Sequence, residues 1–299
     1  MKKILVSVML ISFLVNTGCD FSGGCFQGYG PVITQVREIS DFTSVSNVGD
    51  FEVRVTLSDN FGVEVEAQEN LHEFIEIYVS GSNLVVKTKD NVCFNSIAAV
   101  LVFVSMPEIK EISNTGSGRL SADKAVSYEF ECSNSGSGQI AIDSIYASTI
   151  TLNNSGSGSL DVRASYPDEI QVIQTGSGEI SAGFINESLD VSINHTGSGK
   201  IYASVLDGLD VDVTLTGSGL VYLDGTAETA GLGLSSSGKI DAVDLMVSDA
   251  DAMSSGSGRI YVYATEYLDV TISGSGNVYY RGNPQINSSI SGSGSLKPY

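Results

Sequence analysis

The tripeptide Gly-Ser-Gly recurs nine times at a nearly constant spacing, which restricts the fold more than any other feature of this sequence. It stands at 116–118, 136–138, 156–158, 176–178, 197–199, 217–219, 256–258, 274–276 and 292–294, with Ser236-Ser237-Gly238 in the one remaining register. Successive second glycines are 18 to 21 residues apart. A repeat this regular indicates one structural unit stacked many times.

Apolar residues lie an even number of positions from each second glycine, which is the period of a half-buried strand. Two residues after it stand Leu120, Ile140, Leu160, Ile180, Ile201, Val221, Ile240, Ile260, Val278 and Leu296, and six before it Ile112, Cys132, Leu152, Val172, Ile193, Val213, Leu232, Ala252 and Val270, with Ser288 breaking the second column. A unit of about 20 residues cannot bury its inner face alone, so neighbouring units must share a core. The sequence predicts an all-β fold, a right-handed parallel β-helix (β-solenoid) with about 20 residues per turn. A β-propeller is disfavoured because its blades need about 40 to 45 residues.

The position four residues before the second glycine has the same inward parity, yet it is polar in five successive units. It holds Asn114, Asn134, Asn154, Gln174 and His195 before it changes to Leu215 and Leu234. Buried amides must find hydrogen-bond partners. In a parallel stack each amide can donate to the next, so these five are predicted to form an internal structural ladder in preference to a ligand site.

The Gly-Ser-Gly motif itself does not match a known ligand loop. A phosphate loop needs a following helix and a Lys-Ser or Lys-Thr pair, and a calcium-binding β-roll needs a recurring Asp beside its glycines. Neither pattern occurs in the repeats. We therefore expect no metal and no cofactor, and we expect the glycines to permit tight corners and close approach of successive turns.

Residues 1–18 have the pattern of an export signal, with basic Lys2 and Lys3 before an apolar run from Ile4 to Val15 that is too short to span a bilayer. A small residue stands directly before Cys19, as in lipoprotein signals, although Asn16 departs from the usual aliphatic residue. An ordinary secretory signal is the alternative. We expect Cys19 to carry the lipid, residues 19–40 to be the lipidated N-terminus and tether, and the protein to lie in the bacterial cell envelope, at the outer membrane on its periplasmic or surface face.

The charge and the cysteines fit an exported protein. Loss of Lys2 and Lys3 with the signal takes the net charge from −20 to −22. Such a surface repels nucleic acid and anionic lipid, so the lipid alone is expected to contact the membrane and no nucleic-acid partner is expected. Export permits disulfides, and Cys25 with Cys93 is a more plausible pair than one with Cys132, since both lie in irregular stretches.

Residues 41–112 also alternate, with strands centred near Val65, Val86 and Phe103. Their spacing of roughly 20 residues favours atypical N-terminal turns or a cap of the same solenoid, and a separate β domain is the alternative. Residues 113–299 form the Gly-Ser-Gly repeat β-helix.

A resemblance to a known family rests on this region. The segment VFVSMPEIKEI, which contains Val104-Ser105-Met106-Pro107 and leads into the glycine turns, and the preceding FTSVSNVGDFEVRVTL and SGSNLVVKT are similar to the family named putative auto-transporter adhesin, head GIN domain. The likeness covers roughly residues 40 to 299. It implies a right-handed parallel β-helix on exported, often lipidated bacterial proteins, and no established activity.

Three functional interpretations remain. The position three after the second glycine carries Tyr202, Tyr222, Tyr261 and Tyr279, interrupted by Asp241. A row of solvent-facing rings about 5 Å apart could stack sugar rings, or it could simply stabilise neighbouring turns. Alternatively, the rod is an adhesin-like scaffold whose partner is an envelope protein.

The third interpretation is a carbohydrate-active enzyme, as on other β-helices. The candidate carboxylates Asp161, Asp190, Asp210, Asp212, Asp241 and Asp269 are scattered among turns, Trp is absent, and the only histidines are His72 and His195. The sequence therefore favours a non-catalytic protein without catalytic residues.

Overall fold

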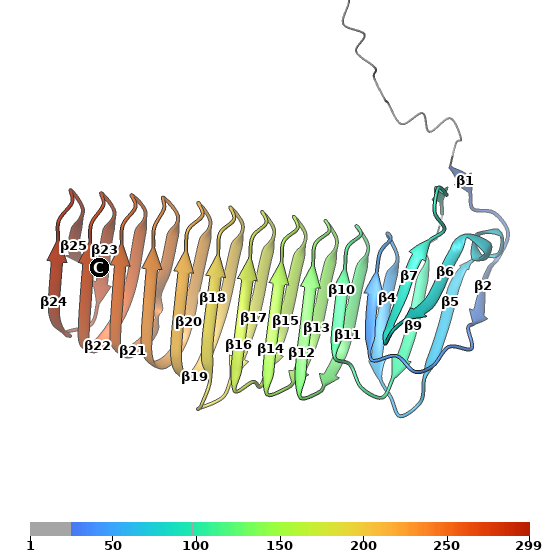
Figure 1. Ribbon diagram of the computed structural model, residues 1–299, viewed down its shortest axis with the longest axis horizontal. Coiled ribbons are helices and arrows are strands. Elements are labelled where there is room, and N and C mark those ends of the chain that lie inside the picture. The colour runs from blue at the N-terminus through green and yellow to red at the C-terminus, as the bar shows by residue number, and fades with distance from the viewer. Residues whose placement is uncertain (1–24, 97) are drawn as a thin grey trace, which may run out of the picture.

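The computed structural model describes residues 25–96 and 98–299. The chain forms a rod of stacked coils with an additional group of strands at its N-terminal end (Figure 1). Each regular coil contributes one strand to each of two rows, and the strands within a row pair in parallel. The predicted solenoid with about 20 residues per turn is confirmed.

The first strand row faces one side of the rod. In spatial order it contains β9 (Leu101–Met106), β4 (Glu52–Leu57), β11 (Arg119–Val126), β13 (Gln139–Tyr146), β15 (Ser159–Ser165), β17 (Glu179–Ile185), the first halves of β19 (Lys200–Leu215), β20 (Leu220–Leu234), β21 (Lys239–Ser254) and β22 (Arg259–Ile272), then β23 (Asn277–Arg281) and β25 (Ser295–Pro298).

The second strand row faces the other side. It contains β7 (Asn83–Thr88), β3 (Ser44–Asn47), β10 (Glu111–Asn114), β12 (Glu129–Asn134), β14 (Thr149–Asn154), β16 (Glu169–Gln174), β18 (Asp190–His195), the second halves of β19 to β22, and β24 (Gln285–Ile290).

The core is built from identical positions of successive coils. Ile140, for example, is in register with Leu120 on one side and Leu160 on the other, and all three are at most 1% exposed. Complete burial of such a side chain is worth about 1.5–3 kcal/mol relative to exposure. Because every coil repeats this arrangement, the alternation read from the sequence becomes one continuous apolar column along the rod.

The glycines of the repeat are required by close stacking and not by an unusual backbone angle. None of the Gly-Ser-Gly glycines has a positive φ among the described residues. A Cβ atom on Gly138 would lie 2.0 Å from the carbonyl oxygen of Gly118 and 2.5 Å from Asn114 Nδ2. A side chain at this corner would therefore separate the coils, which supports the expected close approach of successive turns.

The segment before the repeats enters the solenoid in a different spatial order from its sequence. β3 and β4 form one coil that stacks directly on β10 and β11. The chain then passes outward through β5 (Gly62–Gln68), the 3₁₀ helix η1 (Glu69–Phe74) and β6 (Ile75–Ser80) before β7 and β9 form the outermost parallel coil. It returns across that coil to begin the repeats.

The outermost coil is capped by antiparallel strands. β5 pairs with β9, β2 (Val32–Val36) pairs with β5, and β6 pairs with β7. Val86 and Phe103 thus lie in parallel solenoid strands, whereas Val65 lies in antiparallel β5, which belongs to the cap. Strands that cover the last coil in this way shield its unpaired edge from other chains.

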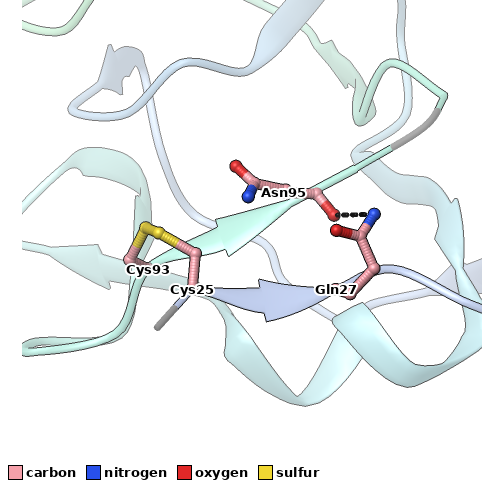
Figure 2. Close-up of a disulfide and its surroundings, with 4 residues drawn as sticks. All are labelled: Cys25, Gln27, Cys93 and Asn95. Atoms are coloured by element: carbon pink, nitrogen blue, oxygen red, sulfur yellow. Dashed lines mark hydrogen bonds between the residues drawn. A yellow bond between two sulfur atoms is a disulfide. The ribbon is translucent and has the colours of Figure 1, made fainter. Parts of the chain in front are cut away.

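A disulfide between Cys25 and Cys93 confirms the predicted pair (Figure 2). Beside it, β1 (Phe26–Gln27) pairs in parallel with β8 (Phe94–Asn95), and Gln27 Nε2 donates to the Asn95 carbonyl at 3.5 Å. Residues 25–40 therefore differ from the expected tether, since β1 and β2 are attached to the cap. Cys132 is a free buried thiol whose pKa is raised by burial.

Cys19, the predicted lipid site, lies outside the described residues. Within residues 25–96 and 98–299, no helix is sufficiently long and apolar to traverse a bilayer.

Candidate functional site

The predicted ladder residues Asn114, Asn134, Asn154, Gln174 and His195 all point into the core and are at most 1% exposed. Their main hydrogen bonds are made to backbone carbonyl oxygens and not from amide to amide. Each side chain contacts the carbonyl oxygen of the second glycine of its own corner, four residues later, at 2.9 to 3.4 Å. An amide-to-amide bond also occurs, from Asn114 Nδ2 to Asn134 Oδ1 at 3.3 Å.

The bond to the corner carbonyl is kept where the column changes from Asn to Gln174 and His195. Each of these side chains carries an N–H group that can reach an inward carbonyl oxygen. His195 places its two ring nitrogens 2.9 and 3.0 Å from the carbonyl oxygens of Gly199 and Gln174. These contacts join the end of each strand to the following corner inside the core.

Sequence reasoning missed the first member of this column, Asn47. It pairs in register with Asn114, is fully buried, and donates through Nδ2 to the Phe51 carbonyl at 3.0 Å. The signal was present in Asn47-Val48-Gly49, which matches Asn114-Thr115-Gly116, but Phe51 replaces the second glycine and hides the motif.

The four predicted glycan-contacting tyrosines lie on the outward face of the first strand row, but they do not form one continuous platform. All four are half-buried. Asp241 occupies the coil between Tyr222 and Tyr261 and divides the column into two pairs.

In the second pair, the faces of the rings are already occupied. Tyr261 stacks on Tyr279 with centroids 4.9 Å apart and planes inclined by 13°, and Tyr299 packs edge-on against Tyr261. Lys239 Nζ lies 4.6 Å from the Tyr261 centroid and 2.6 Å from Asp241 Oδ2. This pair therefore stabilises neighbouring coils and has little free ring surface for a ligand.

The first pair lines an open groove of about 410 Å³. The rings of Tyr202 and Tyr222 are 6.2 Å apart and tilted by 51°, so they are not stacked face to face. The groove is lined by Asp161, Val162, Arg163, Ser181, Ala182, Gly183, Tyr202, Ala203, Ser204, Tyr222 and Asp224. Gly183 is in register with Ser204 and lies against the backbone of Arg163, and its lack of a side chain deepens the hollow.

The Tyr222 hydroxyl is fixed by a hydrogen bond that it donates to Asp244 Oδ2 at 2.9 Å. This bond, burial and the charges of Asp244, Asp224 and Asp241 raise the pKa of Tyr222 to about 12. The ring is thus held neutral and in one orientation beside carboxylates. Aromatic faces next to hydrogen-bonding groups are suited to sugar rings, which have both apolar and hydroxylated surfaces.

A second, larger hollow of about 910 Å³ follows the Gly-Ser-Gly corners of five coils, next to the start of the first strand row. Its walls include the serines Ser117, Ser137, Ser157, Ser177 and Ser198 and no aromatic ring. It offers hydrogen bonds along the rod but no stacking surface, so the Tyr202–Tyr222 groove is the better candidate site.

The candidate catalytic carboxylates are less scattered than the sequence suggested. On the second strand row, a hollow of about 410 Å³ brings together Asp210, Asp212, Asp249, Asp251 and Asp269. Burial, together with the like charge of Asp210, raises the pKa of Asp212, and burial with the charge of Asp269 raises that of Asp251. The register of the repeat predicts this alignment, because Asp212, Gly231, Asp251 and Asp269 are in-register partners.

The arrangement of these carboxylates does not form a metal site. Among the described residues, no three His, Cys, Asp or Glu side chains are placed to hold a metal ion. Asp161 and Asp241 lie on the other row, and Asp190 does not line the hollow.

The stacked coils and the antiparallel cap define the chain as a β-solenoid repeat protein. The family model described as putative auto-transporter adhesin, head GIN domain, matches residues 41–207 and 184–284. The chain therefore belongs to this family, whose members are adhesin-like proteins of the cell surface or envelope.

Solved structures agree with this fold. A putative adhesin from Parabacteroides distasonis is 20% identical with a TM-score of 0.58, and covers 92% of this chain and 100% of its own. A putative adhesin from Parabacteroides merdae is also 20% identical, with a TM-score of 0.56 and coverage of 93% and 100%. A putative lipid binding protein from P. distasonis is 25% identical, with a TM-score of 0.50 and coverage of 92% and 100%. No curated protein matches the sequence.

Proposed function

We propose that this protein is a lipid-anchored, non-catalytic adhesin of the bacterial cell envelope that binds glycans in the Tyr202–Tyr222 groove. The observation that carries the proposal is the tilted, unstacked arrangement of these two rings at 6.2 Å, with hydroxyl and carboxylate groups around them. Each ring is expected to contribute about 1 kcal/mol to binding a sugar.

A glycan array and titrations with the best-binding oligosaccharide test this function. The mature chain from Asp20 onward is suitable, since it keeps Cys25 and its disulfide with Cys93. Replacing both Tyr202 and Tyr222 with Ala should weaken binding by about 30-fold, the effect of about 2 kcal/mol.

The chain supplies a matched control in its second tyrosine pair. The double change Tyr261→Ala and Tyr279→Ala removes the same number of rings from the same column. It should lower the melting temperature without lowering the affinity for the glycan. Equal losses of affinity in both double variants, or no glycan bound by the parent protein, would contradict the proposal. In the second case a protein partner of the envelope becomes the better interpretation.

The lipid anchor is proposed from the signal-like segment that precedes Cys19. Mass spectrometry of the protein from bacterial membranes should find a mature N-terminus at Cys19 with covalently bound acyl chains. An unmodified Cys19, or a mature chain that begins elsewhere, would contradict the lipid anchor. The proposed glycan binding in the groove would not be affected.

A further inference from the structure

The geometry points to a specific ligand class for the Tyr202–Tyr222 groove: glycans that carry protonated amines, such as oligosaccharides of unacetylated amino sugars. This inference rests on the proposed glycan-binding function and adds its selectivity. The selectivity is argued from the charges around Tyr222 and from the ammonium group of Lys239, which lies over Tyr261 in the same tyrosine column.

Carboxylates predominate around the groove. Asp161 and Asp224 line it, and Asp244 accepts the hydrogen bond of the Tyr222 hydroxyl. No ion pair joins any of these three to a basic side chain within residues 25–96 and 98–299. Acidic side chains therefore outnumber basic ones at the groove, where Arg163 is the one basic residue of the lining.

The one basic residue that lines the groove, Arg163, has an acidic partner, and so does Lys239 in the neighbouring tyrosine pair. Arg163 Nη1 lies 3.3 Å from Asp143 Oδ1, and Lys239 Nζ lies 2.6 Å from Asp241 Oδ2. A glycan carboxylate or sulfate in the groove would meet Asp161 and Asp224, and the one basic side chain of the lining is already paired with Asp143. The net charge of −20 for the whole chain opposes such a ligand further.

Lys239 shows how this column holds an ammonium group. Its Nζ lies 4.6 Å from the centroid of Tyr261 and is bonded to the carboxylate of the neighbouring Asp241. A ring face and a carboxylate thus hold one ammonium between them, a combination that is favourable for both cation–π and ionic reasons.

Tyr222 has the same two elements, a ring and adjacent carboxylates, but no basic side chain is found over its ring in the described part of the chain. A ligand amine can take the position that Lys239 takes at Tyr261, while the sugar ring lies against Tyr202. Acetylation of the amine removes the charge and with it both interactions.

Titration of the mature chain with three tetrasaccharides of equal length tests the selectivity: glucosamine, N-acetylglucosamine and galacturonic acid oligomers. We expect the glucosamine oligomer to bind at least about tenfold more tightly than its acetylated counterpart, and the uronate not to bind. Asp224→Asn should remove most of this preference, seen as a smaller ratio between the affinities for the two oligomers.

Asp249→Asn is the matched control, because it removes the same charge from an exposed position on the second strand row. It should leave the preference intact. If Asp249→Asn reduces glucosamine binding as much as Asp224→Asn does, general attraction to an acidic protein explains the binding and the inference is overturned. Equal affinity for the amine and acetylated oligomers overturns the inference but leaves the proposed glycan-binding function standing. If no glycan on the array binds the protein, both the inference and the proposed function are overturned.

Discussion

Asn134 Nδ2 donates to the carbonyl oxygen of Gly138 at 3.1 Å, which joins the end of a strand to the corner that follows it in the same coil. The same nitrogen lies 3.3 Å from the Ser159 carbonyl oxygen in the next coil. The two hydrogens of this buried amide group are thus donated to two different carbonyl oxygens. The side chain thereby connects two coils from inside the core.

Replacing Asn134 with Asp should destabilise the protein by about 3 kcal/mol. The new carboxylate would place negative charge against the carbonyl oxygens of Gly138 and Ser159 in a site that is 1% exposed. Thermal or denaturant unfolding measures the loss.

Asn134→Leu is the comparison for that variant. Leucine already occupies this column at Leu215 and Leu234, and the Gly138 carbonyl keeps the backbone hydrogen bond from Ser159 at 3.1 Å. We expect Leu to cost less than Asp. Similar melting temperatures for the Asp variant and the parent would show that the column does not hold the coils together.

Gly138→Ala tests the reason for the repeat motif. Its Cβ would lie 2.0 Å from the Gly118 carbonyl oxygen, so the coils must separate, and we expect a loss of about 3 kcal/mol. Gly233→Ala is the control, because its Cβ would meet nothing closer than Val213 O at 3.5 Å. This second change should be neutral or slightly stabilising. If both variants unfold at the same temperature as the parent, close stacking is not what selects glycine.

Much of this architecture could be predicted from the sequence, because each stacked coil repeats the same pattern of apolar, polar and glycine positions. The in-register apolar columns, the inward polar column and the glycine corners all repeat with the same offsets. The bonding of the polar column could not be read in this way. Whether Asn134 faces Asn154 or the Gly138 carbonyl depends on the path of the corner, which side-chain parity does not specify.

The N-terminal cap could be predicted less well. Strands near Val65, Val86 and Phe103 have the spacing of solenoid coils, yet Val65 lies in an antiparallel strand. Spacing along the chain does not distinguish a parallel return from an antiparallel one when the glycine corners are absent. The pairing of Cys25 with Cys93 could be predicted, since export and the irregular flanking sequence favoured it.

The candidate site was predictable in its residues but not in its geometry. Register placed Tyr202, Tyr222, Tyr261 and Tyr279 in one column, as the alternation required. The interruption at Asp241 was visible as well. The sequence could not show that Lys239 lies over the Tyr261 ring and pairs with Asp241, because those contacts depend on side-chain conformation.

The ionisation of Tyr222 should occur at unusually high pH. Its hydrogen bond to Asp244 and its burial raise its pKa to about 12, above the usual value of about 10. The stability that this shift contributes is fully present below about pH 10 and is lost as pH rises through about 12. Subtracting the ultraviolet-monitored titration of Tyr222→Phe from that of the parent should isolate one tyrosine that ionises near the higher value. A difference curve centred near pH 10 would mean that the Asp244 bond does not form.

The most direct measurement of the glycan site is hydroxyl-radical footprinting of the mature chain with and without the best-binding oligosaccharide. Tyr202 and Tyr222 should lose most of their oxidation when the glycan is bound, because the sugar covers their exposed ring faces. Tyr128 and Tyr267, which are 74% and 54% exposed and lie outside the groove, should oxidise equally in both samples. Unchanged oxidation of Tyr202 and Tyr222 under saturating glycan, or protection confined to Tyr128 or Tyr267, would contradict the account.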